Sequence, residues 1–233
     1  MSEDIVKLSG VSKRYRKVEA VRNATFVLRR AALTAFLGEN GAGKTTTIKL
    51  ILGFLTPDAG AIEKRPERIG YVPEQPAFSP WLTGARLLEY TARAGSLSRS
   101  DLESRVREYA RLLNFEQALL ERTVRTYSLG NHKKFSYLQS LILDPDFLIV
   151  DEPFTALDPV AIKSVRDLFL DLKRQGRTLL LSSHLISEME KICDDVIIIR
   201  RGEIVFHDEY GRVRETGKDL ENLFLEFAGR GSS

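Results

Sequence analysis

This 233-residue chain has few of the sequence features that are typical of secreted proteins, of cysteine-cluster metalloproteins or of membrane-spanning proteins. The sequence holds one cysteine, Cys193, which excludes an internal disulfide bond and a cysteine-cluster metal site. Its longest apolar runs, such as residues 179–181 and 196–199, are far shorter than the about 18 residues that span a membrane. The acidic start of the chain lacks the pattern of a signal peptide. We therefore expect a protein of the reducing cytosol, unless a partner holds it at a membrane.

The chain also lacks a large excess of either positive or negative charge. Lys and Arg number 35 and Asp and Glu number 32, so the formal net charge is +3. This excess is too small to indicate a protein that binds nucleic acid. Hydrophobic residues make up 43% and charged residues 29%, which suits a folded core and argues against disorder. At about 150 residues per domain, the length predicts one large domain or a domain with a subdomain.

The order of the predicted elements favours an α/β fold. Short apolar runs between turn residues predict strands at 5–8, 24–28, 33–37, 68–72, 147–150, 178–182, 196–199 and 203–207. Capped or amphipathic segments predict helices at 45–54, 159–175, 186–192 and 220–227. This alternation predicts a mostly parallel sheet flanked by helices. We expect one domain with a core at 1–74 and 144–210, a helical subdomain at 75–143, and a C-terminal helix and tail at 211–233.

A glycine-rich segment follows the strand predicted at 33–37. Residues 38–45 read Gly-Glu-Asn-Gly-Ala-Gly-Lys-Thr, the pattern of a phosphate-binding loop between a strand and a helix. Backbone N–H groups would surround phosphate oxygens, Lys44 would reach the β- and γ-phosphates, and the Thr45 hydroxyl would bind Mg²⁺. The alternative is a plain glycine turn. The candidates for nucleotide binding here are Gly38, Asn40, Gly41, Gly43, Lys44, Thr45 and Thr46.

Two carboxylates follow the strand predicted at 147–150. Because ligands bind at the carboxyl ends of parallel strands, we expect Asp151 near the same phosphates, where it would hold Mg²⁺. Glu152 is the candidate for polarising an attacking water. Either acid could instead cap a helix or lie in a loop. These features leave GTPases, small-molecule kinases, helicases and transport ATPases open.

Further motifs narrow this choice. Residues 151–159 (Asp-Glu-Pro-Phe-Thr-Ala-Leu-Asp-Pro) resemble the second acidic motif and aspartate loop of ABC (ATP-binding cassette) ATPases, and residues 182–184 (Ser-Ser-His) resemble their switch histidine. Residues 127–131 (Tyr-Ser-Leu-Gly-Asn) stand where the signature motif of that family belongs. Residues 11–15 resemble the adenine-stacking position, and residues 70–75 resemble the loop that reports to membrane subunits. A kinase or GTPase would explain neither the Ser-Ser-His run nor the second aspartate.

The resemblance implies a P-loop NTPase fold with an N-terminal antiparallel β subdomain and an inserted helical subdomain. It implies an ATPase in which two cassettes close head to tail around two ATP molecules, each supplying its signature motif to the nucleotide bound by the other. His184 would contact the γ-phosphate and orient water with Glu152. Tyr15 would stack on adenine, unless it is an ordinary aromatic at a strand end. The site residues implied in this way are Tyr15, Ser128, Gly130, Asp158, His184 and, as a metal ligand, Glu74.

The sequence departs from the family pattern in three places. Leu129 stands where the signature usually has its first glycine, and Asn131 where it has glutamine. Glu74 replaces the usual glutamine of the reporting loop, with Gln75 beside it. Residues 60–68 are short for a segment in which the family usually has a hairpin.

The chain looks most like the ATPase subunits of bacterial export systems, whose membrane-spanning permease is a separate polypeptide. This resemblance implies a place at the cytoplasmic face of the cell membrane, held by the permease, and no nucleic-acid partner. The alternative is a soluble non-transport ABC ATPase that acts on ribosomes or DNA. The chain shows none of the tandem cassettes, coiled-coil insertions or basic extensions that are usual in that class.

The segment 76–82 bears on the membrane partner. It contains two large aromatics, Phe78 and Trp81, in a proline-rich stretch that predicts a loop, with Thr83 as the cap of a following helix. The aromatics either pack inside the helical subdomain or form part of a groove for a short cytoplasmic helix of the permease.

Overall fold

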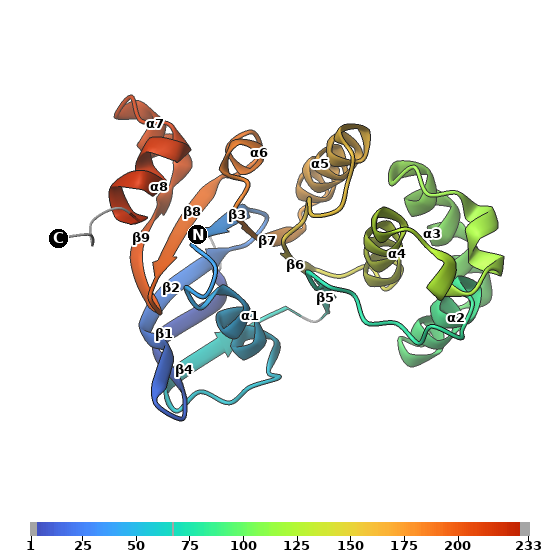
Figure 1. Ribbon diagram of the computed structural model, residues 1–233, viewed down its shortest axis with the longest axis horizontal. Helices are drawn as coiled ribbons and strands as arrows, with labels where there is room; N and C mark the ends of the chain where they lie inside the picture. Colours follow the sequence, from blue (N-terminus) through green and yellow to red (C-terminus); the bar gives the residue numbers. More distant parts are fainter. Residues whose placement is uncertain (1–3, 67, 229–233) are drawn as a thin grey trace.

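A six-stranded sheet forms the centre of the computed structural model, which describes residues 4–66 and 68–228 (Figure 1). Its strands, in spatial order, are β5 (Ile69–Val72), β6 (Phe147–Asp151), β7 (Thr178–Ser183), β3 (Leu33–Leu37), β8 (Asp195–Arg200) and β9 (Glu203–Glu209). The first five are parallel and β9 is antiparallel to β8. The predicted mostly parallel sheet is confirmed, and each predicted strand of this sheet lies within two residues of its observed bounds.

Alternate residues of the central strands enter two separate cores. In β3, Leu33, Ala35 and Leu37 face one core, while Phe36 faces the other. The same alternation occurs in β6 and β8, because successive side chains of a strand point to opposite faces of the sheet. Both faces are covered, which explains why these strands are almost wholly apolar.

The second sheet covers one of these faces together with helix α1 (Lys44–Leu52). It is antiparallel, with the order β2 (Val18–Arg29), β1 (Asp4–Tyr15) and β4 (Ala59–Lys64). This is the N-terminal β subdomain that the resemblance implied. Strands β1 and β2 are longer than predicted, because register shifts along β1 carry the pairing past the turn residues. Strand β4 was not predicted, since it is a mostly exposed edge strand without an apolar alternation.

Other helices pack on the opposite core: α5 (Pro159–Arg174), α6 (Ile186–Glu190), α7 (Tyr210–Glu215) and α8 (Leu220–Ala228). Asp158 caps α5, as the sequence predicts, with its Oδ1 accepting from the Ala161 N–H at 2.8 Å. Helix α1 ends before the predicted residue 54, because Gly53 adopts φ 81 and closes it. Helix α7 was not predicted, and the predicted tail at 229–233 lies outside the described residues.

A helical lobe lies on the far side of the central sheet from α7 and α8 (Figure 1). It consists of α2 (Gly84–Ala94), α3 (Arg99–Leu112), the 3₁₀ turns η1 (Gln117–Glu121) and η2 (Val124–Thr126), and α4 (Leu129–Leu141). Thr83 caps α2, and its hydroxyl accepts from the Arg86 N–H. The division into a nucleotide-binding core and a helical subdomain remains our proposal, which the separate position of the lobe supports. Among the described residues, no helix is both long and apolar enough to cross a bilayer.

Candidate nucleotide site

A cavity of about 400 Å³ lies at the carboxyl ends of β3 and β6, beside the start of α1. Ala20 and Glu39 contribute to its wall. The remaining lining residues are all sequence candidates: Asn40, Gly41, Gly43, Lys44, Thr45, Thr46, Glu74, Asp151 and Glu152. Residues far apart in the chain therefore meet where the topology of a parallel sheet predicts a ligand site.

The loop that forms the floor of this cavity fits closely against two strands. A Cβ atom at Gly43, where φ is 110, would lie 2.4 Å from the Ala20 carbonyl oxygen. A Cβ atom at Gly38 would lie 2.5 Å from the Ile199 carbonyl oxygen, so Gly38 supports the loop from below and does not line the cavity. Glycine is required at both positions, since any larger residue would displace the backbone.

Lys44 is buried in the loop that carries it. The residue is only 7% exposed. Its Nζ donates to the carbonyl oxygens of Gly38 at 2.6 Å and Glu39 at 3.3 Å. These neutral acceptors hold the ammonium at the wall of the cavity. An anionic phosphate is a stronger acceptor than a carbonyl oxygen, so it would draw the ammonium toward itself.

Asp151 and Thr45 form a site that fits Mg²⁺. The Thr45 hydroxyl donates to Asp151 Oδ2 at 2.9 Å, and the Ser182 hydroxyl donates to Asp151 Oδ1. Asp151 is nearly fully buried, and Glu74 lies exposed at the rim. One carboxylate and one hydroxyl, completed by phosphate oxygens and water, are donors that Mg²⁺ prefers in nucleotide sites. Ser182 was missed as a site residue by the sequence analysis.

Glu152 is held in a rare backbone conformation at the same cavity. Its φ is 50, in the left-handed region that residues other than glycine seldom adopt. The residue is 5% exposed, and its Oε2 lies 2.8 Å from His184 Nδ1 and 3.4 Å from the His184 backbone N–H. Backbone strain of this kind persists only where surrounding contacts fix it, and it clusters at functional sites. Glu152 lines the cavity, whereas His184, whose side chain is 57% exposed, contacts that carboxylate without lining the cavity.

Other sequence candidates lie outside the cavity. Tyr15 ends β1 and is 44% exposed. Ser128 is the exposed N-cap of α4, and its Oγ accepts from the Asn131 N–H at 3.2 Å. Gly130 lies against the loop after β6, since its Cβ would approach the Ala156 carbonyl oxygen at 3.1 Å. Asp158 is engaged as the cap of α5. Within one chain, therefore, the phosphate loop and acidic strand meet, while the signature residues stay apart from them.

Lys133 is a buried residue that the sequence analysis missed. It is 2% exposed, and its Nζ donates to the carbonyl oxygens of Asp151 at 2.9 Å and Pro73 at 3.1 Å. Burial lowers the pKa of Lys133 to about 8, against the opposing effect of the nearby carboxylates. A sequence signal existed: Lys133 lies four residues before Tyr137 and so shares its buried face of α4.

The two aromatic residues of the segment 76–82 differ in how far they are buried. The Phe78 ring stacks on His132 with centroids 6.0 Å apart and meets Phe135 edge-on at 5.1 Å, so it packs inside the helical lobe. The neighbouring Trp81 is 71% exposed, with the Arg125 guanidinium 5.2 Å from its ring centroid. Internal packing is therefore confirmed for Phe78 and wrong for Trp81.

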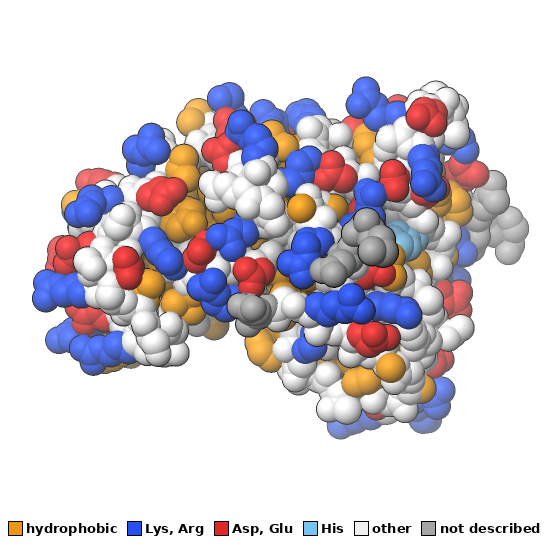
Figure 2. Space-filling view, turned by 180° about the vertical axis from the view of Figure 1, so that it is seen from behind, with side chains coloured by type: hydrophobic (Ala, Val, Ile, Leu, Met, Phe, Trp, Pro, Cys, Tyr) orange, Lys and Arg blue, Asp and Glu red, His pale blue; other side chains and the backbone are white. Residues whose placement is uncertain are grey.

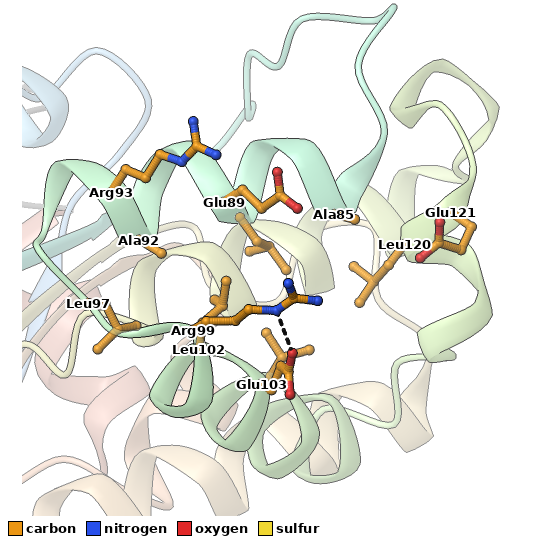
Figure 3. A pocket seen from close by; sticks show the side chains of 12 residues that line it. Ala85, Glu89, Ala92, Arg93, Leu97, Arg99, Leu102, Glu103, Leu120 and Glu121 are labelled. Carbon is orange, nitrogen blue, oxygen red and sulfur yellow. Dashed lines mark hydrogen bonds and ion pairs between the residues drawn. The ribbon is translucent and has the colours of Figure 1, made fainter.

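A second cavity, of about 410 Å³, lies between α2 and α3 (Figure 3). Apolar side chains such as Ala85, Ala92 and Leu102 line it, and the ion pair of Arg99 with Glu103 lies along it. It lacks the glycine loop and the adjacent acids Asp151 and Glu152 of the first cavity, so the first cavity is the better candidate for a nucleotide.

Comparison with known proteins agrees with this geometry. The family model described as ABC transporter matches residues 21–155. The uncharacterized ABC transporter ATP-binding protein YxlF of Bacillus subtilis is 35% identical over 217 residues, which cover 91% of this chain and 73% of that protein. The Nod factor export ATP-binding protein I of Ralstonia nicotianae is 33% identical over 212 residues, covering 86% and 66%. A solved ATP-binding subunit of an ABC transporter superposes with a TM-score of 0.89 at 29% identity, covering 96% of this chain and 99% of that one.

Proposed function

This chain belongs to the ABC transporter family as an ATP-binding subunit and ATPase, and we propose that it powers an exporter whose permease is a separate polypeptide. Two copies would close head to tail around ATP at the cytoplasmic face of the membrane. The relative from Ralstonia nicotianae, described as an export protein, supports the direction of transport.

One observation carries the proposed closure: Ser128 and Leu129 of the signature are exposed and lie outside the cavity that the phosphate loop lines. Beside these motifs Leu129 is 77% exposed and Val160 is 65% exposed, so both apolar side chains are open to a partner surface. A second copy placed head to tail would bury both and bring Ser128 to the open side of the bound nucleotide. The γ-phosphate would then be bound on two sides, as charge stabilisation in the transition state requires.

Within this arrangement each residue has a role in hydrolysis. Lys44 would leave its carbonyl acceptors and donate to the β- and γ-phosphates. Glu152 would orient the attacking water and accept its proton, while His184 fixes that carboxylate through their 2.8 Å contact. Mg²⁺, when bound at Thr45 and Asp151, would neutralise charge on the phosphates. Tyr15 would stack on adenine.

The Glu152→Gln variant tests closure. Its amide cannot accept a proton, so hydrolysis should fall about 10²- to 10⁴-fold while ATP still binds. The ATP-bound form should then accumulate as a homodimer, measured by light scattering with Mg-ATP. The matched control is Glu108→Gln on the exposed face of α3, which should stay active. A Glu152→Gln variant that remains monomeric and fully active would overturn both the role and the closure.

The permease is the second part of the proposal. Trp81 is a large exposed aromatic in a loop that Phe78 anchors to the lobe, and exposed tryptophans are among the residues that most often dominate interfaces. Loop residue Glu74 would pass motion from the nucleotide site to this surface. In Figure 2 the Lys and Arg side chains (blue) are interspersed with Asp and Glu side chains (red). The face seen there therefore offers no continuous positive surface for nucleic acid.

Co-purification of Trp81→Ala with an integral membrane protein tests the permease surface. This variant should stay folded and bind ATP, but it should be lost from membranes. Phe78→Ala should instead lower the stability of the isolated chain, because it empties a packed site. Glu74→Ala should keep the permease while weakening the stimulation of ATPase by it. Recovery of ribosomes or DNA with the wild-type chain, and of no membrane protein, would favour the non-transport alternative.

A further inference from the structure

Three segments of the molecule meet at one ammonium group. Helix α4, which begins at the signature, carries Lys133. Strand β6 presents the Asp151 carbonyl oxygen 2.9 Å from Lys133 Nζ, and the loop after β5 presents the Pro73 carbonyl oxygen at 3.1 Å. Asp151 is the proposed metal ligand, and Pro73 directly precedes Glu74. Two of the backbone segments that bring acids to the cavity, those of Glu74 and Asp151, are thus tied to the same side chain.

A lysine is an expensive residue to bury at this place. Lysines are almost never fully buried unless they are paired, and an apolar side chain would fill the same space at lower cost. Lys133 lies beside Tyr137 on the packed face of α4, where a core residue would be expected. The ammonium is therefore retained for its polar contacts rather than for packing.

The charge of the cavity gives a reason for this cation. Three of the acidic residues at the cavity, Glu74, Asp151 and Glu152, interact electrostatically with Lys133. Lys44 is the one lysine or arginine that lines the cavity within the described residues, and it faces the phosphate loop. Lys133 approaches from α4, and it contacts the Asp151 carbonyl oxygen without lining the cavity. Its positive charge would offset these carboxylates when ATP, itself polyanionic, binds beside them.

We propose that Lys133 is a positioning residue of the nucleotide site, which clamps the backbone at Pro73 and Asp151 and offsets the charge of the three carboxylates. This inference rests on the site roles proposed above. The stacking of Phe78 on His132, the neighbour of Lys133, gives the same loop a second attachment to the same turn of α4. These contacts hold three segments together: helix α4, the loop after β5 that carries Glu74, and strand β6.

The test compares Lys133→Met with Lys134→Met in the full chain. Methionine matches the length of lysine and has neither the charge nor the donor. Lys134 is a fair control, since its Nζ also donates to a backbone carbonyl oxygen, that of Asn114 at 2.9 Å, but away from the cavity. Three quantities are measured: turnover at saturating Mg-ATP, the thermal midpoint, and the Kd of ATP with Mg²⁺ and with EDTA.

The charge role predicts a change that a loss of packing would not cause. Without Lys133, free ATP should be repelled by the uncompensated carboxylates more than Mg-ATP is. The ratio of the Kd in EDTA to the Kd with Mg²⁺ should therefore rise about 5- to 10-fold in Lys133→Met. Adding Glu74→Gln to this variant should bring the ratio back toward wild type. Turnover should fall at least ~10-fold, because the acids are no longer held in place. Lys134→Met should match wild type in turnover and in the ratio.

Two results would overturn the inference: wild-type turnover in Lys133→Met, or reduced turnover with an unchanged Kd ratio. Reduced turnover with an unchanged Kd ratio would mean that Lys133 contributes to packing and not to the charge of the site. Neither result would affect the proposed phosphate site, which fails separately if Lys44→Ala keeps its activity.

Discussion

The phosphate-loop side and the signature side of this molecule differ in how far each is completed by its own chain. On the first side, Lys44, Asp151 and Glu152 are buried, and each contacts a polar group of its own chain: the Gly38 carbonyl oxygen, the Thr45 hydroxyl and the His184 ring respectively. On the second side, Ser128 and Leu129 are exposed, and the Ser128 hydroxyl caps its own helix. The first side therefore has donors and acceptors that fit phosphate and metal. The second needs another surface, which we propose is a second copy of the chain.

The largest expected effect is on the phosphate-loop side. Lys44→Ala removes the loop cation that we propose donates to the phosphates, so steady-state ATP hydrolysis should fall about 10²- to 10³-fold. Lys49→Ala, on the exposed side of the same helix, should leave hydrolysis within a few-fold of wild type. A Lys44→Ala variant with near-normal turnover would show that the cavity is not the phosphate site.

Mixing variants of the two sides tests whether they act between chains. Lys44→Ala and Ser128→Ala should each be nearly inactive alone. In a mixed dimer, one composite site keeps both an intact Lys44 and an intact Ser128, so an equimolar mixture should recover about a quarter of wild-type activity.

The control for this complementation is a mixture of Lys44→Ala with Glu152→Gln. Both changes lie on the phosphate-loop side, so no composite site is complete and no activity should return. Equal recovery in the two mixtures would contradict the division of the site between chains.

A smaller effect is expected at Tyr15. If its ring stacks on adenine, Tyr15→Ala should weaken ATP binding about 5- to 150-fold, from roughly 1–3 kcal/mol of stacking. Tyr15→Phe should bind nearly as wild type, and Tyr90→Ala, which removes another exposed tyrosine, should not change the Kd. Unchanged binding in Tyr15→Ala would make Tyr15 an ordinary strand-end aromatic.

The smallest effect concerns stability at the start of α5. Asp158→Ala removes an N-cap and should lower the free energy of unfolding by about 0.5–2 kcal/mol. Asp158→Asn should keep most of that stability, because asparagine caps helices as well as aspartate does. Denaturant titration measures both. If Asp158→Asn is stable yet slow in hydrolysis, the carboxylate has a role beyond capping.

Sequence patterns anticipated the parts of the site that lie close together in the chain. The phosphate loop could be predicted because its glycines, Lys44 and Thr45 are consecutive and lie between a strand and a helix. The position of the acids at the end of β6 could be predicted because they directly follow a single apolar run. The residues that were missed, Ser182 as a partner of Asp151 and Lys133, bond to groups far away in sequence, so no local pattern reveals their contacts.

The sequence by itself determined the central sheet, the caps of α2 and α5, and the phosphate loop, since backbone propensity and short-range hydrogen bonds act between near neighbours. Only the tertiary structure decided that Phe78 is packed while Trp81 is exposed, that the mostly exposed segment Ala59–Lys64 becomes a strand, and that Lys133 is buried against the backbone of Asp151. Each of these outcomes depends on a surface supplied by a distant segment: the helical lobe for Phe78, strand β1 for β4, and the carbonyl groups of Pro73 and Asp151 for Lys133.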